Sequence, residues 1–281
     1  MKKLILLLSI VSAALFSSGA TFGHPAAKPA PAVADDESMY RVTRFEGQPI
    51  TGVTASNGFR VEVRRSAGTS VQVEVPAEWQ QRLICTLSPD GTLSLSMNFE
   101  GLRNPEAGQC NAVVELPAFD ALRASNGARI TCEGGFTSSD VLVKASTGGS
   151  IRDLALKASR ATVDISTGGS VRGLDLTAEQ AAITGATGGS LSGLVLKAGQ
   201  ADIEAATAFS LNDATVDVPT LSCKAATASS VTLSHTGRAT KLHAGTCGSI
   251  RISGSTGTLA KNDPSETAGS IVTDGYRVRG E

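Results

Sequence analysis

Apolar and polar residues alternate over much of the chain, and this alternation predicts β-strands rather than helices. Leu154, Leu156 and Ala158 occupy every second position, and Val163 and Ile165 begin a second alternating set. A period of two places one set of side chains in an interior and the next set in solvent, whereas an amphipathic helix needs a period of about 3.6. The pattern therefore predicts an all-β protein.

The alternation belongs to a repeat, and the repeat predicts the architecture. The repeated segments are 145–151, 165–171, 185–191, 205–211, 225–231 and 244–250. Less regular copies span 55–61, 124–130 and 266–271. Strands that return in the same direction after each repeat build a single-stranded parallel β-helix, a solenoid of about 20 residues per coil, because a propeller blade needs about 40 residues.

One threonine per coil forms the most regular column of the repeat. The column consists of Thr147, Thr167, Thr187, Thr207, Thr227 and Thr246. Thr167 continues the alternation of Val163 and Ile165, which predicts that the column points inward. We interpret it as a structural hydroxyl ladder; the alternative, a threonine array that binds ice, needs an exposed flat face.

Residues 40–122 are rich in predicted strands but less regular than the coils of 123–275. Two alternating valine strands flank a turn at 66–69, which predicts a hairpin, and a further turn signal at 89–92 precedes another strand. We interpret 40–122 as a β-rich N-terminal cap of one domain that spans 40–275, because repeat arrays need atypical ends. The alternative is an independent N-terminal domain, although no linker-like stretch precedes residue 123.

The ends of the chain differ from this domain. Residues 1–20 have a basic start, a short apolar run and small residues, as in a secretory signal peptide that is cleaved after Ala20. The alternative is an uncleaved anchor, although the apolar run is shorter than the roughly 20 residues that a spanning helix needs. Residues 21–39 are predicted to be a linker rich in Pro and Ala, and 276–281 a short tail. We expect an exported protein without a transmembrane helix that is periplasmic, associated with the outer envelope or secreted.

The composition fits a narrow interior. The 281 residues include 30 Gly but only 8 Phe, 2 Tyr and 1 Trp, so Leu, Ile, Val, Ala and Thr must fill the coils. The 25 basic and 26 acidic residues leave a net charge of −1. This balance argues against nucleic acid as a partner, because nucleic-acid binding draws on an excess of positive charge.

Five cysteines are available for disulfides in an exported protein. Their number is odd and no CxxC spacing occurs, so we predict neither a metal site nor another cofactor. Cys85 and Cys110 are the favoured disulfide pair, with Cys132 as a rival partner for either. Cys223 falls in an apolar column, which predicts a buried free thiol, and Cys247 replaces a turn glycine, which predicts a position near the surface.

Several segments of the chain together form a recognisable pattern. It runs from Phe45 through Asn57-Gly58-Phe59 to Val63, continues with Val71-x-Val73 and Gly91-x-Leu93-x-Leu95, then from Val113 to Gly127, and is followed by the Thr-Gly-Gly-Ser turns. This pattern resembles the auto-transporter adhesin head, or GIN domain, family of bacterial exported proteins. The resemblance covers about residues 40–275. It implies an exported right-handed β-helix with an adhesive role and brings no catalytic residues. The chain departs from the pattern at 207–210 and 227–230, where the turn glycines are missing.

Parallel β-helices also include enzymes, whose sites need carboxylates or basic residues that converge on one face. Alignment of the coils separates Asp164 from Glu204 by a threonine, and no column holds two adjacent carboxylates. His235 and His243, with a serine beside the first, can be drawn into a nucleophilic set. Solvated surface histidines are the simpler interpretation.

These observations predict an exported, noncatalytic β-helix protein that serves as a binding, adhesion-like or envelope structural module. Its partner would be an envelope protein or a glycan, and its oligomeric state is left open. The alternative is a carbohydrate-active lyase or hydrolase. Phe209 interrupts the small-residue turns and is the candidate contact residue, because exposed aromatic rings often bind sugars; the other interpretation is that it tucks over the edge of the coil.

Overall fold

The computed structural model describes residues 38–101, 109–237, 239–254, 258–263, 269–274 and 277–278. The predicted signal peptide and nearly all of the predicted linker lie outside these residues, and the domain boundaries remain predictions. The described residues form 21 β-strands and one short 3-10 helix, η1 (Ala77–Arg82).

The strands of the first half are β1 (Met39–Arg44), β2 (Gly52–Ala55), β3 (Arg60–Arg65), β4 (Ser70–Pro76), β5 (Leu83–Leu87), β6 (Thr92–Met97), β7 (Asn111–Leu116), β8 (Ala121–Ala124) and β9 (Arg129–Glu133). They are followed by β10 (Gly135–Ala145), β11 (Ser150–Ile165), β12 (Ser170–Gly185), β13 (Ser190–Ala205), β14 (Ser210–Asp217) and β15 (Thr220–Ala225). The last strands are β16 (Ser230–His235), β17 (Ala239–Ala244), β18 (Ser249–Ser253), β19 (Thr258–Asp263), β20 (Ser270–Asp274) and β21 (Arg277–Val278).

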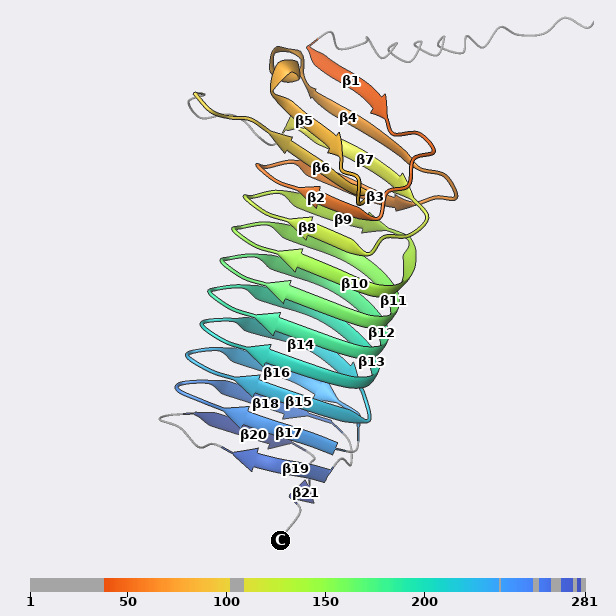
Figure 1. Ribbon diagram of the computed structural model, residues 1–281. Coiled ribbons are helices and arrows are strands. Elements are labelled where there is room, and N and C mark those ends of the chain that lie inside the picture. Colours follow the sequence, from red (N-terminus) through yellow and green to blue (C-terminus); the bar gives the residue numbers. More distant parts are fainter. Residues whose placement is uncertain are drawn as a thin grey trace, which may run out of the picture. The chain divides into compact units, whose positions relative to one another are not determined.

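Strands β11, β12 and β13 show how one coil lies on the next (Figure 1). They pair in parallel, so that Val163 lies opposite Ile183, and Ile183 opposite Ile203. Neighbouring coils are therefore offset by one repeat and stand about 4.8 Å apart. The structure confirms the predicted parallel β-solenoid with a β-rich N-terminal cap.

Columns of apolar side chains, one from each coil, fill the interior. One such column contains Val143, Val163, Ile183, Ile203, Cys223 and Leu242. Every member is at most 2% exposed. Each large aliphatic side chain buried in this way stabilises the fold by about 1.5–3 kcal/mol relative to an exposed one. The column also confirms that Cys223 is a buried thiol.

Tight turns close the coils on one edge. In the first regular coil, Thr147 and Gly148 both have positive φ, at 48° and 71°, and the amide of Gly149 donates to the carbonyl of Ser146 at 2.8 Å. Two positive φ values in succession are the mark of a type I′ turn. A Cβ on Gly149 would lie 2.2 Å from the carbonyl oxygen of Ala124, so the neighbouring coil requires glycine there.

The threonine column is exposed, and the prediction that it points inward is wrong. All six threonines lie on the outside of the turns. The alternation that begins at Val163 stops at Ile165, because the chain reverses at the next residue and Thr167 adopts a φ of 48°. Backbone hydrogen bonds link the turns of neighbouring coils, because the amide of Gly148 donates to the carbonyl of Thr167 at 3.1 Å.

The N-terminal cap contains the antiparallel pairs, but the predicted hairpin at 66–69 is wrong. Strand β1 pairs with β4, β4 with β7 and β5 with β6, all antiparallel. Strand β7 also pairs in parallel with β3, and it therefore lies between β3 and β4. The turn at 66–69 spans a gap of one strand, which β7 fills later in the sequence. The pairing of β5 with β6 places the 89–92 turn signal at a hairpin.

Two outer faces of the solenoid carry most of its charged residues. Face A is the outer surface of 52–55, 92–97, 121–124, 141–145, 161–165, 181–185, 201–205 and 220–225. Face B is the outer surface of 39–44, 70–76, 111–116, 60–65, 129–133, 150–152, 170–172, 190–192, 210–212, 230–234, 249–253 and 270–274.

Candidate functional site

Phe209, the predicted contact residue, is buried. Its side chain is 1% exposed, and a Cβ on Gly185 would lie 2.1 Å from its ring. Residue 185 stands in register with Ile165 on one side and Ala205 on the other. The ring of Phe209 thus occupies space that a side chain at 185 would need, and the prediction that it contacts a ligand is wrong.

All five cysteines are free thiols, so the predicted Cys85–Cys110 disulfide is not formed. Cys85 belongs to β5, which pairs with β6, whereas Cys110 directly precedes β7, which pairs with β3 and β4. Burial raises the pKa of Cys110 to about 11 and those of Cys132 and Cys223 to about 12. Cys247 is exposed in its turn, as the sequence predicts.

His235 is fully buried, and its interpretation as a solvated surface residue is wrong. It continues the column of Val216, its register partner, and its Nε2 lies 2.9 Å from the carbonyl oxygen of Val218. Burial lowers the pKa of His235, against the opposing effects of that carbonyl and of Asp217. A buried histidine in an apolar column is not available to a substrate.

The described part of the chain holds no group of three or more His, Cys, Asp and Glu side chains that could bind a metal. It likewise contains no helix long and apolar enough to cross a membrane. The remaining candidate surfaces of the described residues are the outer faces of the solenoid.

Face A is stabilised by ion pairs between coils. Lys144 Nζ lies 2.6 Å from Asp164 Oδ2, and Lys224 Nζ lies 3.2 Å from Glu204 Oε1. In both pairs the partners are directly opposite each other in register. Arg123 also lies opposite Lys144, but Lys144 is already paired with Asp164. Opposite charges across neighbouring strands stabilise a sheet by about 0.2–1 kcal/mol.

Face B has the reverse arrangement at its N-terminal end. Arg60 lies directly opposite Arg129, and Arg152 directly opposite Arg172. Within the described residues, none of the four guanidinium groups has a hydrogen bond or an ion pair with another side chain. We call these four residues the arginine quartet. Like charges directly opposite each other destabilise a sheet, so the fold itself does not favour this arrangement.

The acidic residues of face B that could neutralise the quartet are engaged elsewhere. Arg64 Nε lies 2.8 Å from Glu62 Oε1 and 3.2 Å from Glu133 Oε2. Glu115 accepts a hydrogen bond from the hydroxyl of Ser70 at 2.9 Å. Asp153 lies at the corner that follows Arg152, where its φ of 56° ends the alternation of the strand.

Arg152 carries a further sign that the quartet is not a packing feature. Its Nε is buried and has no hydrogen-bond partner in the described structure. An unsatisfied buried donor costs about 1–3 kcal/mol. Ser192 occupies the same register position one coil beyond Arg172, so a small neutral residue is compatible with this place in the coil.

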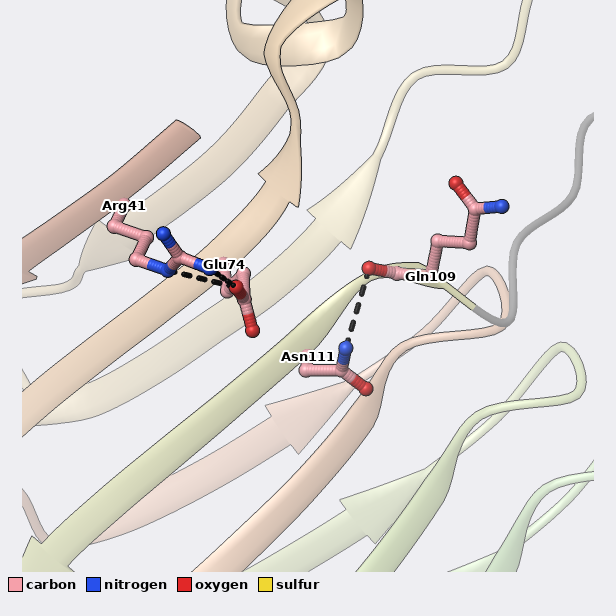
Figure 2. A network of polar contacts seen from close by, with 4 residues as sticks. All are labelled: Arg41, Glu74, Gln109 and Asn111. Atoms are coloured by element: carbon pink, nitrogen blue, oxygen red, sulfur yellow. Dashed lines mark hydrogen bonds and ion pairs between the residues drawn. The ribbon is translucent and has the colours of Figure 1, made fainter. Parts of the chain in front are cut away.

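A concavity of about 380 Å³ adjoins the quartet on β1, β4 and β7. Arg41 Nη2 lies 2.6 Å from Glu74 Oε1 and joins β1 to β4, and Asn111 donates from Nδ2 to the backbone carbonyl of Gln109 at 3.3 Å (Figure 2). Asn111 lies directly opposite Arg60, so the concavity and the quartet form one continuous surface. The other polar side chains of its lining are Thr43 and Gln72.

The arginine quartet is absent from the sequence-based predictions, although the repeat contains a signal for it. Arg60 and Arg129 occupy the same position in two irregular copies of the repeat, and Arg152 and Arg172 the same position in two regular coils. A column of positive charges at one position of the repeat is thus visible in the sequence, but the order of the strands that brings the two pairs together is not.

Comparison with known families identifies the chain. The family described as "Putative auto-transporter adhesin, head GIN domain" matches residues 49–212, which is more than half of the chain. The chain belongs to the GIN domain family. The matched range contains the whole arginine quartet, and the GIN domain resemblance seen in the sequence is confirmed.

Solved structures share the fold of this GIN domain protein. A "putative adhesin" from Parabacteroides merdae has a TM-score of 0.66 and 12% identity, with 86% of this chain and 96% of that chain covered. A "putative adhesin" from Bacteroides fragilis has a TM-score of 0.52 and 17% identity, with 85% and 96% covered. A "putative lipid binding protein" from Parabacteroides distasonis has a TM-score of 0.64 and 12% identity, with 85% and 97% covered. At these identities the likeness shows the fold alone.

A search of proteins with curated descriptions gives no match. The family and two of these structural neighbours are described as adhesins, and the third neighbour is described as a lipid binding protein. None of these descriptions assigns a ligand to a surface of this chain.

Proposed function

We propose that this protein is an exported, noncatalytic binding protein of the adhesin-like type, and that it holds its partner on face B at the arginine quartet. The observation that carries the proposal is the presence of two like-charged register pairs on neighbouring strands, Arg60 opposite Arg129 and Arg152 opposite Arg172. Local arrangements that lower stability are expected at functional sites, where another requirement outweighs the loss. The adhesin-like family supports a binding role.

The quartet supports a polar partner over a lipid. One structural neighbour is described as a lipid binding protein. The large apolar residues that the described structure exposes are Ile84, Val195 and Val272, which lie on β5, β13 and β20. They form no continuous apolar patch with the quartet, whereas adsorption to lipid draws on such a patch.

Retention on cell-envelope material tests the proposal. The variant Arg60→Ser/Arg129→Ser/Arg152→Ser/Arg172→Ser removes the quartet and installs the residue found at equivalent positions of other coils. A matched control, Lys157→Ser/Arg160→Ser/Lys197→Ser/Lys241→Ser, removes the same charge from exposed side chains outside face B.

The wild-type protein should be retained on immobilised envelope extract. The retained amount should fall by about tenfold or more for the quartet variant and by less than about threefold for the control. Equal losses for both variants, or no retention of the wild type, would overturn the proposed binding surface. Export has a separate test, because N-terminal sequencing of the mature protein should begin at Thr21 if the signal peptide is cleaved after Ala20.

A further inference from the structure

The arginine quartet forms a regular charged array. Its residues lie on β3, β9, β11 and β12, which follow one another in the sheet of face B. Adjacent strands are about 4.8 Å apart, so the four Cα positions span about 15 Å across the strands. Arg152 and Arg172 lie two residues further along their strands than Arg129, as Arg129 pairs with Ser150. The array is therefore a short diagonal line of positive charge and not a single pocket.

The residue type narrows the chemistry of the ligand. A guanidinium group is planar and donates two parallel hydrogen bonds to a carboxylate or a sulfate, which lysine cannot do. Four such groups in a line fit a chain that carries an anionic group at regular intervals. A single small anion would leave most of the quartet unpaired.

The surroundings favour an acidic sugar chain over a single-stranded nucleic acid. The outer positions of the four strands of the quartet hold no aromatic residue, and single-stranded nucleic acids depend on aromatic stacking for much of their affinity. The adjoining concavity offers amide and hydroxyl groups from Gln72, Asn111 and Thr43. Such groups hydrogen-bond to the hydroxyls of sugars.

We propose that the quartet and the adjoining concavity bind a linear acidic polysaccharide, with the guanidinium groups of Arg60, Arg129, Arg152 and Arg172 on its carboxylates or sulfates. This inference rests on the proposed binding role of face B and names the ligand class. The ligand also neutralises the repulsion between the paired arginines, so the protein is stabilised when it binds.

Binding to defined polymers tests the ligand class. Polygalacturonate supplies carboxylates, dextran sulfate supplies sulfates, uncharged dextran is the neutral control, and single-stranded DNA is the control for unspecific polyanion binding. Each is titrated by biolayer interferometry against the wild type, the quartet variant and the matched charge control used for envelope retention. Thermal unfolding monitored by circular dichroism checks that all three proteins are folded.

The proposal expects binding to polygalacturonate or dextran sulfate, no binding to dextran, and a loss of about tenfold or more in the quartet variant only. Affinity should fall as salt is raised, because the contacts are between charges. The stronger of the two acidic polymers identifies the anionic group. Arg152→Lys should weaken binding although it keeps the positive charge, because lysine cannot donate two parallel hydrogen bonds to one anionic group.

Three results would overturn the ligand class. They are equal losses in the quartet variant and the charge control, binding of DNA as tight as that of the acidic polysaccharides, and no binding of either acidic polymer. If the polymers fail but the quartet variant still loses envelope retention, face B keeps its binding role and the ligand is of another class. If envelope retention is also independent of the quartet, the proposed function fails as well.

Discussion

The N-terminal coils and the C-terminal coils depart from the repeat at different positions, the former at outer side chains and the latter at inner ones. Near the N-terminus the variation is outside, where Arg60 and Arg129 stand in register with positions that carry serine in later coils. Near the C-terminus it is inside, where Phe209 enters the interior and His235 takes the place of an aliphatic residue. Outer side chains can change freely because the paired backbone is already fixed. An inner change needs a matching change in a neighbouring coil.

The strongest test of this contrast lies in the interior, at Phe209 and Gly185. Phe209→Ala should lower the free energy of unfolding by about 3–5 kcal/mol, because it leaves a cavity. Gly185→Ala should also destabilise the wild type, since its Cβ would lie 2.1 Å from the ring of Phe209. In the Phe209→Ala background the same change should be neutral or stabilising. Urea unfolding of the four proteins measures the coupling, and simple additivity would show that the two residues do not compensate each other.

The buried histidine gives the second effect, a dependence of stability on pH. Burial lowers the pKa of His235 below the 6.5 of an exposed histidine. The unfolded chain therefore takes up a proton before the folded protein does, so His235 stabilises the fold fully above pH 6.5, and this is lost as the pH falls toward the lower pKa of the folded state.

Thermal unfolding at pH 8 and pH 5 measures this effect, and the chosen pH values lie about 1.5 units to either side of the ordinary histidine pKa. His235→Leu should shrink the difference between the two melting temperatures, whereas His243→Leu, which keeps the buried histidine, serves as the control. A difference of the same size in His235→Leu and the wild type would contradict this role of His235.

The outer faces should give smaller effects of opposite sign. Arg172→Ser on face B should stabilise the protein by about 0.2–0.5 kcal/mol at low salt, because it relieves repulsion with Arg152. Lys224→Ser on face A should destabilise it by a similar amount, because it leaves Glu204 unpaired. Both changes should vanish in 1 M salt, where charges are screened over about 3 Å. The same sign at the two positions would remove the contrast between the faces.

The smallest effect on stability is expected at the exposed thiol. Cys247 should react with a maleimide in the folded protein without changing its unfolding, because the side chain lies outside the coil. Cys85, Cys110, Cys132 and Cys223 are buried and should react only in urea, and burial raises the pKa of each. Intact-mass spectrometry counts the labels, and more than one label on the folded protein would show that a buried column opens.

The sequence predicted the solenoid because its signal is periodic. Val163, Ile183 and Ile203 repeat with one spacing, and strands that pair in register keep that spacing in space. The predictions that were wrong concern the direction of side chains at the turns, where the alternation ends. Thr167 was expected to point inward because alternation cannot show where a chain reverses, and its positive φ appears only in the structure.

The errors at Phe209 and at the candidate site have a different cause. The fate of Phe209 depends on Gly185, which lies in an earlier coil and lacks the side chain that would otherwise fill the space. The quartet depends on strand order, since β9 lies next to β3 although about 70 residues separate them in the chain. That Arg60 and Arg129 are neighbours can be seen only from the pairing of β3 with β9.

The register of the coils has an evolutionary consequence. A slip of one residue would exchange every inward side chain with an outward one, so insertions that are not whole repeats are strongly opposed. Insertion of a complete coil between β12 and β16, at a point that keeps Gly185 beside Phe209, would preserve the contact types of the interior and would move the quartet relative to the C-terminal coils by about 4.8 Å. The distance between the quartet and the C-terminal coils can thus change only in steps of one coil. Duplication of one repeat in the gene can lengthen it without other substitutions in the quartet or in the C-terminal coils.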